Sequence, residues 1–335
     1  MSRLCTSFCL LLAHFVMVYA YRTFDSNQPY NIQRTGIKRK IEWKQFADPV
    51  PLPSEVELFR KNILCRPGEF GPLDASRQLE LELECYDVGM TYEQGACMRK
   101  QLLIKKALTN AHKLKDRKVL RRLSKAFENK RKSLLDMSLE IGMPPVSVFR
   151  AILSYRLARI YKLSKQERNR IIKSMVYGVD IEVINEFLCD DWEFLQMQTA
   201  KRNDIVGYAG HDINIPQEWE DRVLAYLNKH GINFMTENDL RESDSTSTPD
   251  CLVLDDLYIN NRPIRWIEVK SFYASGLKEN EFMAKKSIFK QVKRYNIEFG
   301  SGAVILKNGF SDILIAKLES TLLLDGGPLS DSSIF

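Results

Sequence analysis

The sequence is poor in the residues that build zinc and redox sites. Its 335 residues include 4 scattered histidines and 7 cysteines, and no two cysteines stand in a CxxC pair. Local spacing therefore assembles neither a zinc cluster nor a thiol redox motif. Any metal that this chain binds is expected to be a hard cation held by oxygen ligands.

One long uncharged run stands at the N-terminus. Residues 4–21 lack any charged side chain, and Val18-Tyr19-Ala20 offers small residues near a cleavage point. Residues 1–20 are therefore typical of a signal peptide. The basic, proline-rich segment 21–53 would then be a leader and linker. A signal peptide followed by such a leader would suggest a secretory route to an organelle. The alternatives are an uncleaved membrane anchor, since a bilayer needs at least about 17 apolar residues, and an unreliable start codon.

The remaining cysteines do not suit the disulfide framework of a secreted protein. They are odd in number and widely spaced: Cys65, Cys85, Cys97, Cys189 and Cys251. A reducing compartment fits them better. The leader and the cysteines thus point to different locations.

Hydrophobic residues make up 44% of the chain, which is enough to bury a sizeable core in about two or three domains. Helical periodicity dominates residues 54–200 and predicts an all-α region. From residue 201 to residue 335 the pattern predicts a small α/β domain, with strands near 232–236, 251–259, 264–269 and 303–306 and helices near 217–229 and 279–298.

Positive charge is concentrated in one part of the helical region. The whole chain carries a formal charge of +6, whereas residues 99–132 hold fourteen basic residues against two acidic ones, a local charge of +12. Helices that turn an apolar stripe toward the core would leave these basic side chains exposed to solvent. The pattern favours a surface for a nucleic-acid backbone over a merely solvated face.

Residues 133–157 have the pattern of a helix-turn-helix. One helix would run from Ser133 to Ile141 and end at Gly142, and a second would begin at Pro144-Pro145. On the second helix the residues expected to point outward, as groove-facing residues would, are Ser147, Arg150 and Ser154. An ordinary helical hairpin without a DNA role remains open on spacing alone.

The candidate catalytic residues lie in residues 247–272, which read STPDCLVLDDLYINNRPIRWIEVKSF. Asn260-Asn261 is a turn signal between two strand-forming runs, which predicts a β-hairpin. Because side chains alternate along a strand, Glu268 and Lys270 point to the same face. In the paired hairpin, Asp250 lies near both.

Two carboxylates and an ammonium group at one place suit the hydrolysis of phosphodiesters. Asp250 and Glu268 would hold Mg²⁺ or Mn²⁺, and Lys270 would orient or activate the attacking water. Mg²⁺ commonly takes few protein carboxylates and several waters. On its own this PD…ExK pattern is weak, because an Asp after Pro and a Glu/Lys pair on an exposed strand are common.

An acidic residue on the preceding helix strengthens the pattern. On the expected helix 217–229, Glu220 leans toward the apolar side and is a candidate third metal ligand. Glu218 borders the other edge of the apolar stripe and is the weaker candidate. Interaction with the helix dipole is the alternative explanation for both.

The following helix also carries a polar residue on an apolar face, Gln291. Its spacing from Tyr295 resembles the QxxxY helix of RecB-type nucleases, in which the motif supports the catalytic lysine and the substrate phosphate. The outward basic residues of this helix could follow a nucleic-acid backbone, with a solvated basic face as the alternative: Lys290, Lys293 and Arg294.

Taken in order, these motifs resemble those of the codanin-interacting nuclease family, which is also known for its TPD motif. The resemblance rests on the helix-turn-helix, then EWEDRVLAYLNKHGINFMTENDLR, STPD, IRWIEVK and FKQVKRYNIEFGSGAVI. It is strong over residues 215–310 and extends from about residue 75. The chain departs from the family in its N-terminal leader and in a first helix-turn-helix that is indistinct within residues 75–110.

The resemblance implies helix-turn-helix modules before a restriction-endonuclease-like α/β domain of the PD-(D/E)xK superfamily. The family motif positions fall on Glu220, Asp250, Glu268, Lys270 and Gln291. Members are regarded as nuclear and cytoplasmic nucleases, and animal members bind codanin. The resemblance thus implies a Mg²⁺- or Mn²⁺-dependent nuclease acting on DNA or RNA, with a codanin-like partner and no small-molecule cofactor, and leaves a homodimer open. The rival hypothesis is a catalytically inactive nucleic-acid-binding or adaptor protein on the same fold.

Overall fold

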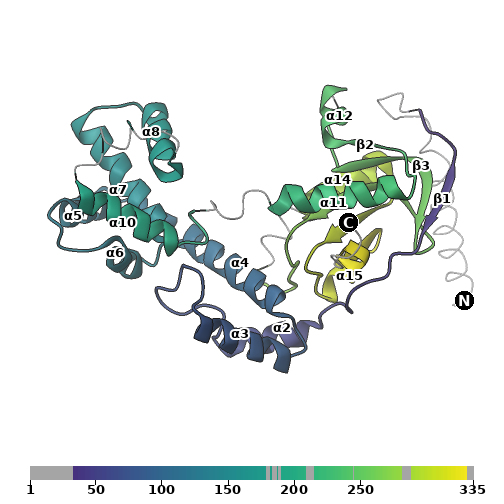
Figure 1. Ribbon diagram of the computed structural model, residues 1–335, viewed down its shortest axis with the longest axis horizontal. Coiled ribbons are helices and arrows are strands. Elements are labelled where there is room, and N and C mark those ends of the chain that lie inside the picture. The colour runs from purple at the N-terminus through teal and green to yellow at the C-terminus, as the bar shows by residue number, and fades with distance from the viewer. Residues whose placement is uncertain are drawn as a thin grey trace, which may run out of the picture.

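The computed structural model describes residues 33–178, 190–208, 215–243, 245–280 and 288–329, together with residues 182 and 187. The chain forms a helical lobe and an α/β lobe, and the long helix α4 (Tyr92–Asn110) runs between them (Figure 1). Residues 1–32 lie outside the described residues, and with them the predicted signal peptide and most of the leader. None of the described helices combines the length and the apolar composition that crossing a bilayer requires.

All regular elements described between residues 52 and 202 are helices, as the periodicity predicted. Those before the helical lobe are α2 (Leu52–Arg60), α3 (Ala75–Asp87) and α4. The helical lobe itself contains η1 (Ala111–Lys115), α5 (Arg117–Glu128), α6 (Leu134–Ile141), α7 (Pro145–Ile160), α8 (Lys165–Tyr177) and α10 (Asp191–Arg202).

The predicted helical hairpin at residues 133–157 is present as α6 and α7. Ser133 caps α6 through a capping box, and Gly142 ends it in the left-handed conformation with φ 70° and ψ 38°. Helix α7 then lies in the middle of the lobe, packed against α5, α6, α8 and α10. A buried ion pair joins α7 to α10, because Arg156 donates two hydrogen bonds to Glu193, of 2.6 and 3.0 Å.

The α/β lobe is built on a mixed six-stranded sheet with the order β1-β3-β4-β5-β6, in which β2 also pairs with β3. Strand β3 runs antiparallel to β4, while β4, β5 and β6 are mutually parallel. The strands are β1 (Lys38–Ile41), β2 (Phe234–Thr236), β3 (Cys251–Ile259), β4 (Arg262–Lys270), β5 (Gly302–Leu306) and β6 (Thr321–Asp325).

Two helices cover opposite faces of this sheet (Figure 1). Helix α11 (Ile215–Lys229) packs through Trp219 and Val223 on one face, and α14 (Lys290–Phe299) packs on the other. The remaining short elements are α12 (Glu237–Glu242), α15 (Ile313–Lys317) and η3 (Gly327–Leu329). The apolar runs of β4 and β5 are therefore buried on both sides, which explains their nearly continuous hydrophobicity.

The predicted hairpin is confirmed, and its register shifts between Leu252 and Leu257. Asn260 and Asn261 form the turn with positive φ of 47° and 62°, and Cys251 pairs with Ile267. On one side of β4, Gly302 starts β5 directly against the indole of Trp266. A side chain at Gly302 would collide with that ring, so the position requires glycine.

The segment expected to be a leader and linker contributes to the sheet instead. Residues 38–41 form β1, which pairs in parallel with the far end of β3. Asn260 in the hairpin turn accepts a hydrogen bond of 2.8 Å from the Trp43 amide and donates one of 3.0 Å to the Trp43 carbonyl. Trp43 itself is buried in the core of the α/β lobe. These contacts join residues more than two hundred positions apart, which local patterns do not reveal.

The packing also departs from the predicted division of the chain at residue 200. Helices α2, α3 and α4 share a core with Tyr273 and Leu277 of the C-terminal half. The Tyr273 hydroxyl donates to buried Glu55 at 2.8 Å, and Gln101 donates to the Tyr273 carbonyl at 2.7 Å. Helices α5–α10 have a separate core. The first part of the helical region thus packs on the α/β lobe, because the residues after β4 present an apolar surface to it.

Candidate active site

The hairpin brings Asp250, Glu268 and Lys270 together at the carboxyl end of β4. Asp250 directly precedes β3, and its Oδ2 accepts a hydrogen bond of 2.6 Å from the Val269 amide between Glu268 and Lys270. The Lys270 ammonium forms an ion pair with Glu268 Oε1. The convergence expected from strand alternation is therefore present in the structure.

Both carboxyl groups are held in a poorly solvated place. Glu268 is 2% exposed, and its Oε2 has no hydrogen-bond partner among the described residues. Burial raises the pKa of Glu268 to about 7, and the charge of Asp250 adds to the rise while Lys270 opposes it. Burial likewise raises the pKa of Asp250, against the opposing effect of Lys270. One buried and one half-buried carboxylate share the single cation Lys270, so a further positive charge would be favoured at this site.

Glu220 reaches the same place from helix α11. It is half-buried, and burial raises its pKa to about 7, with further contributions from the charges of Asp250 and Glu237. Lys270 acts in the opposite direction on the same group, so Glu220 lies within electrostatic range of both motif residues. Glu218, the weaker candidate, is exposed.

One acidic neighbour was not found from the sequence. Glu237 begins the short helix α12 after β2, and its Oε1 accepts a hydrogen bond of 3.2 Å from Thr248 in the segment that leads to Asp250. Its charge raises the pKa of both Asp250 and Glu220. The only local signal was the capping pair Thr236 and Asp239, which predicts a helix start but not its location beside the hairpin.

Helix α14 supplies the polar residue expected on its inner face. Gln291 is half-buried, and its Oε1 is a buried atom without a partner among the described residues. Tyr295, one turn later, donates its hydroxyl to the Thr248 carbonyl at 3.1 Å and packs edge-on against Trp266. Lys290, Lys293 and Arg294 are exposed, as expected.

The basic stretch 99–132 divides into buried and exposed parts. Arg99 is only 3% exposed and donates hydrogen bonds to the carbonyls of Glu69 and Gly71, at 2.9 and 2.8 Å. It serves the fold, not a binding surface. The exposed cations lie on α5 and the turns around it: Lys115, Arg117, Lys118, Arg121, Arg122, Lys125, Lys130, Arg131 and Lys132. We refer to these nine residues as the α5 basic surface.

The outward residues predicted on α7 have neighbours inside the helical lobe. Ser147, Arg150 and Ser154 are each half-buried. Ser154 accepts a hydrogen bond of 3.2 Å from Arg168 of α8, and the Arg150 guanidinium lies over the Tyr177 ring at 5.8 Å. Helix α8 covers this part of α7. The role of α7 as a recognition surface therefore stays a prediction.

The donor set at the hairpin suits a hard divalent cation. Asp250 and Glu268 provide carboxylate oxygens, one of which has no hydrogen-bond partner among the described residues, and the charge of Asp250 contributes to the raised pKa of Glu220. No three His, Cys, Asp or Glu side chains within the described ranges are already gathered as a metal cluster. Two carboxylates completed by water correspond to the coordination that Mg²⁺ commonly takes.

Comparison with known proteins bears on the same part of the chain. Residues 193–326 match the model of the family described as "Protein of unknown function TPD sequence-motif". The chain is 26% identical to CDAN1-interacting nuclease 1 of Danio rerio over 213 residues, which cover 60% of this chain and 64% of that protein. No solved structure matches.

Two further relatives match over shorter stretches. CDAN1-interacting nuclease 1 of Xenopus tropicalis is 30% identical over 117 residues, which cover 35% of this chain and 37% of that protein. An uncharacterised protein of Acanthamoeba polyphaga mimivirus is 30% identical over 125 residues, 36% of this chain and 43% of that protein. The matches thus span less than two thirds of each relative. The family match contains Glu220, Asp250, Glu268, Lys270 and Gln291, so this part of the chain is similar to the TPD-motif family and to the CDAN1-interacting nucleases.

Proposed function

We propose that this protein is a metal-dependent nuclease of the PD-(D/E)xK type that hydrolyses phosphodiester bonds of nucleic acid. The observation that carries the proposal is the meeting of Asp250, Glu268 and Lys270 at the end of β4, with a buried carboxylate oxygen left unpartnered. A structural ion pair between Lys270 and Glu268 needs no second carboxylate beside it, and the half-buried Asp250 carboxylate would be stabilised by a bound cation.

Each residue has a distinct role in this proposal. Asp250 and Glu268 hold Mg²⁺ or Mn²⁺, and Glu220 assists them from α11. A bound cation would offset charge on the phosphate and make a coordinated water more acidic. Lys270 orients the attacking water and is itself positioned by Glu268. Gln291 supports this arrangement from α14, where its unpartnered oxygen is available to Lys270 or to the water.

Metal binding can be measured directly. Wild-type protein titrated with Mn²⁺ in a calorimeter is expected to bind it, and Asp250→Asn is expected to remove the binding because a neutral amide is a poor ligand for a hard cation. Glu218→Gln, an exposed carboxylate on the same side of the sheet as Glu220, should bind like wild type. Equal Mn²⁺ binding by wild type and Asp250→Asn would contradict the assignment of the site.

A panel of labelled DNA and RNA substrates, single-stranded, duplex and branched, tests the reaction itself. Cleavage should require Mg²⁺ or Mn²⁺ and stop with chelator. Tight binding of the panel with no cleavage under any metal condition would instead favour the catalytically inactive binding protein.

The α5 basic surface is proposed to grip the substrate. Arg117, Arg121 and Lys125 follow one another along one side of α5, are exposed, and form no ion pair with any described residue. Contacts from such residues to a nucleic-acid backbone release counterions, so the affinity should fall steeply with salt. Helix α7, the second helix of the predicted helix-turn-helix, packs against α5.

Changing these three residues together to glutamine should weaken binding of duplex DNA at low salt. The slope of log affinity against log salt should become shallower by up to about 2–3, since each lost phosphate contact contributes about 0.9. The matched control changes Lys165, Arg170 and Lys173 on α8 to glutamine, which removes the same charge from another exposed helix. Equal slopes in the two triple variants would show that net charge alone, and not this surface, sets the affinity.

A protein partner is proposed by similarity alone. The names of two relatives record an interaction with CDAN1. We extend this to a codanin-like partner for the present chain, together with the nuclear and cytoplasmic location of the family. Homodimer formation stays a prediction.

A further inference from the structure

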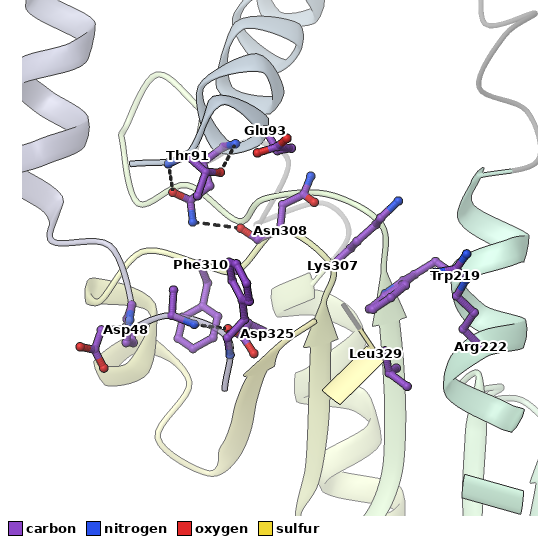
Figure 2. A pocket seen from close by; sticks show the side chains of 15 residues that line it. Asp48, Thr91, Glu93, Trp219, Arg222, Lys307, Asn308, Phe310, Asp325 and Leu329 are labelled. Atoms are coloured by element: carbon purple, nitrogen blue, oxygen red, sulfur yellow. Dashed lines mark hydrogen bonds between the residues drawn. The ribbon is translucent and has the colours of Figure 1, made fainter. Parts of the chain in front are cut away.

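A cavity of about 400 Å³ opens on the α11 side of the sheet, at the carboxyl ends of β5 and β6 (Figure 2). Its walls come from five separate segments of the chain: residues 46–49 after β1, the start of α4, helix α11, residues 307–310 after β5, and Asp325 and Leu329 at and after the end of β6. The volume falls within the range of about 300–1,000 Å³ typical of small-ligand sites.

Two hydrogen-bond donors in this cavity point to an anionic or strongly accepting ligand. Trp219 is 3% exposed, and its indole Nε1 has no partner among the described residues. Figure 2 shows its ring extending from α11 toward Lys307, whose ammonium lies 6.0 Å from the ring centroid. Lys307 is exposed and forms no ion pair with any described residue. A buried N–H left unpaired destabilises the empty pocket, so a ligand oxygen there would be favoured.

An exposed aromatic ring borders the same cavity. Phe46 is 69% exposed, which is unusual for a side chain in a well-ordered turn. Its position is held by Asp325, whose Oδ2 accepts hydrogen bonds from the amides of Phe46 and Ala47 at 2.7 and 2.9 Å. A solvent-facing aromatic ring on a backbone held in this way offers a surface on which a nucleobase can stack.

The acidic residues of the cavity limit the kind of anion that fits. Asp325 already accepts three backbone amides, including that of Gly327 at 2.9 Å. Asp48 and Glu93 are exposed at the rim and offer acceptors for base amino or sugar hydroxyl groups. A ligand with one anionic end and a neutral, hydrogen-bonding body suits this lining better than a bare anion does.

The cavity and the candidate active site lie at the same end of the sheet but on opposite faces. Lys270 pairs with Leu306 in the sheet, and the Lys307 amide donates a hydrogen bond of 2.8 Å to the Lys270 carbonyl. On the other wall, Trp219 is the immediate neighbour of Glu220. Because successive side chains of a strand point to opposite faces, Lys307 faces the α11 side while Lys270 faces the α14 side.

From this lining we propose that the cavity binds a nucleotide, at a site separate from the candidate active site. The phosphate of this nucleotide is held by Lys307 and the Trp219 N–H, and its base lies against Phe46. The proposal goes beyond the proposed nuclease function and does not depend on it. It assigns residues outside the PD…ExK motif to nucleotide binding.

The test uses the full chain and a nucleoside 5′-monophosphate, without divalent metal and with chelator present, in a calorimetric titration. Wild type should bind the monophosphate more tightly than the free nucleoside or inorganic phosphate. Lys307→Met should weaken monophosphate binding about tenfold, the loss of one charge-assisted hydrogen bond. Phe46→Leu should weaken it about fivefold and leave inorganic phosphate binding unchanged. Lys229→Met, at the far end of α11, is the charge-matched control and should bind like wild type.

These outcomes separate the pocket from the nuclease. If metal-dependent cleavage is found but Lys307→Met binds the monophosphate as Lys229→Met does, the pocket assignment is wrong and the nuclease stands. If binding depends on Lys307 and Phe46 but no substrate is ever cut, the nucleotide site stands and the nuclease assignment fails. Inorganic phosphate binding as tightly as the nucleotide would also overturn the proposal, because the base would then contribute nothing.

Discussion

Replacing Glu268 by glutamine is expected to lower metal-dependent cleavage by a factor on the order of 10³ or more while leaving the protein folded. Glutamine has the same shape and keeps an oxygen that can accept from Lys270, so the packing at the end of β4 is preserved. It lacks the negative charge that a hard cation requires. Since Glu268 is buried and 2% exposed, removing its charge should leave the melting temperature unchanged or higher.

The measurement is an initial rate on the best substrate of the panel, with wild-type protein and Glu218→Gln as references. Lys270→Met should reduce the rate to a similar extent by removing the group that orients the water, but it should not abolish Mn²⁺ binding. Rates near wild type for both variants would sink the assignment of the active site. A matching loss in Glu218→Gln would indicate that surface charge, rather than the pocket at β4, governs the rate.

A second large effect is expected in the helical lobe, where Arg156→Met should cost about 3–5 kcal/mol of unfolding free energy. Arg156 and Glu193 are both nearly inaccessible, with exposed fractions of 3% and 4%. Arg156 also donates to the Phe187 carbonyl at 2.9 Å. Removing the guanidinium leaves a carboxylate and a carbonyl inside the lobe without their cation. The measurement is a urea unfolding curve monitored by helical circular dichroism.

The matched control lies on the same helix. Arg159→Met breaks an ion pair of 2.9 Å with Glu128, but the two side chains are 48% and 29% exposed, so the cost should stay below about 1 kcal/mol. The double variant Arg156→Met, Glu193→Leu should recover much of the loss, because no buried charge is left unpaired. Equal destabilisation by Arg156→Met and Arg159→Met would mean that the buried pair adds nothing to the stability of the lobe.

Much of the candidate site was predictable because it is encoded over short distances in the chain. The turn residues Asn260 and Asn261 and the alternation of β4 were sufficient to bring Asp250, Glu268 and Lys270 together. The helical pattern placed Gln291 on the inner face of α14, and its buried, unpartnered oxygen agrees with that. Each of these inferences uses only the period of one element or one tight turn.

The predictions that were wrong concerned features that depend on contacts between distant segments of the chain. Residues 38–41 were predicted to belong to a leader. Four residues in a basic stretch carry no recognisable strand pattern, and they form a strand because the edge of β3 lies beside them. Arg99 counted as a surface cation, although it is buried among backbone carbonyls of the loop after α2. The short elements α12, α15 and β6 lacked enough residues for a clear period.

The sequence by itself determined the hairpin, the acidic and basic residues at its end, and the longer helices of both lobes. The tertiary structure alone decided that Glu237 lies close to them, that α2–α4 pack on the α/β lobe, and that Trp219, Lys307 and Phe46 share a cavity. The reason is physical: turn chemistry and side-chain periodicity act over a few residues. A pocket is formed by surfaces that meet only when the whole chain has buried its apolar area.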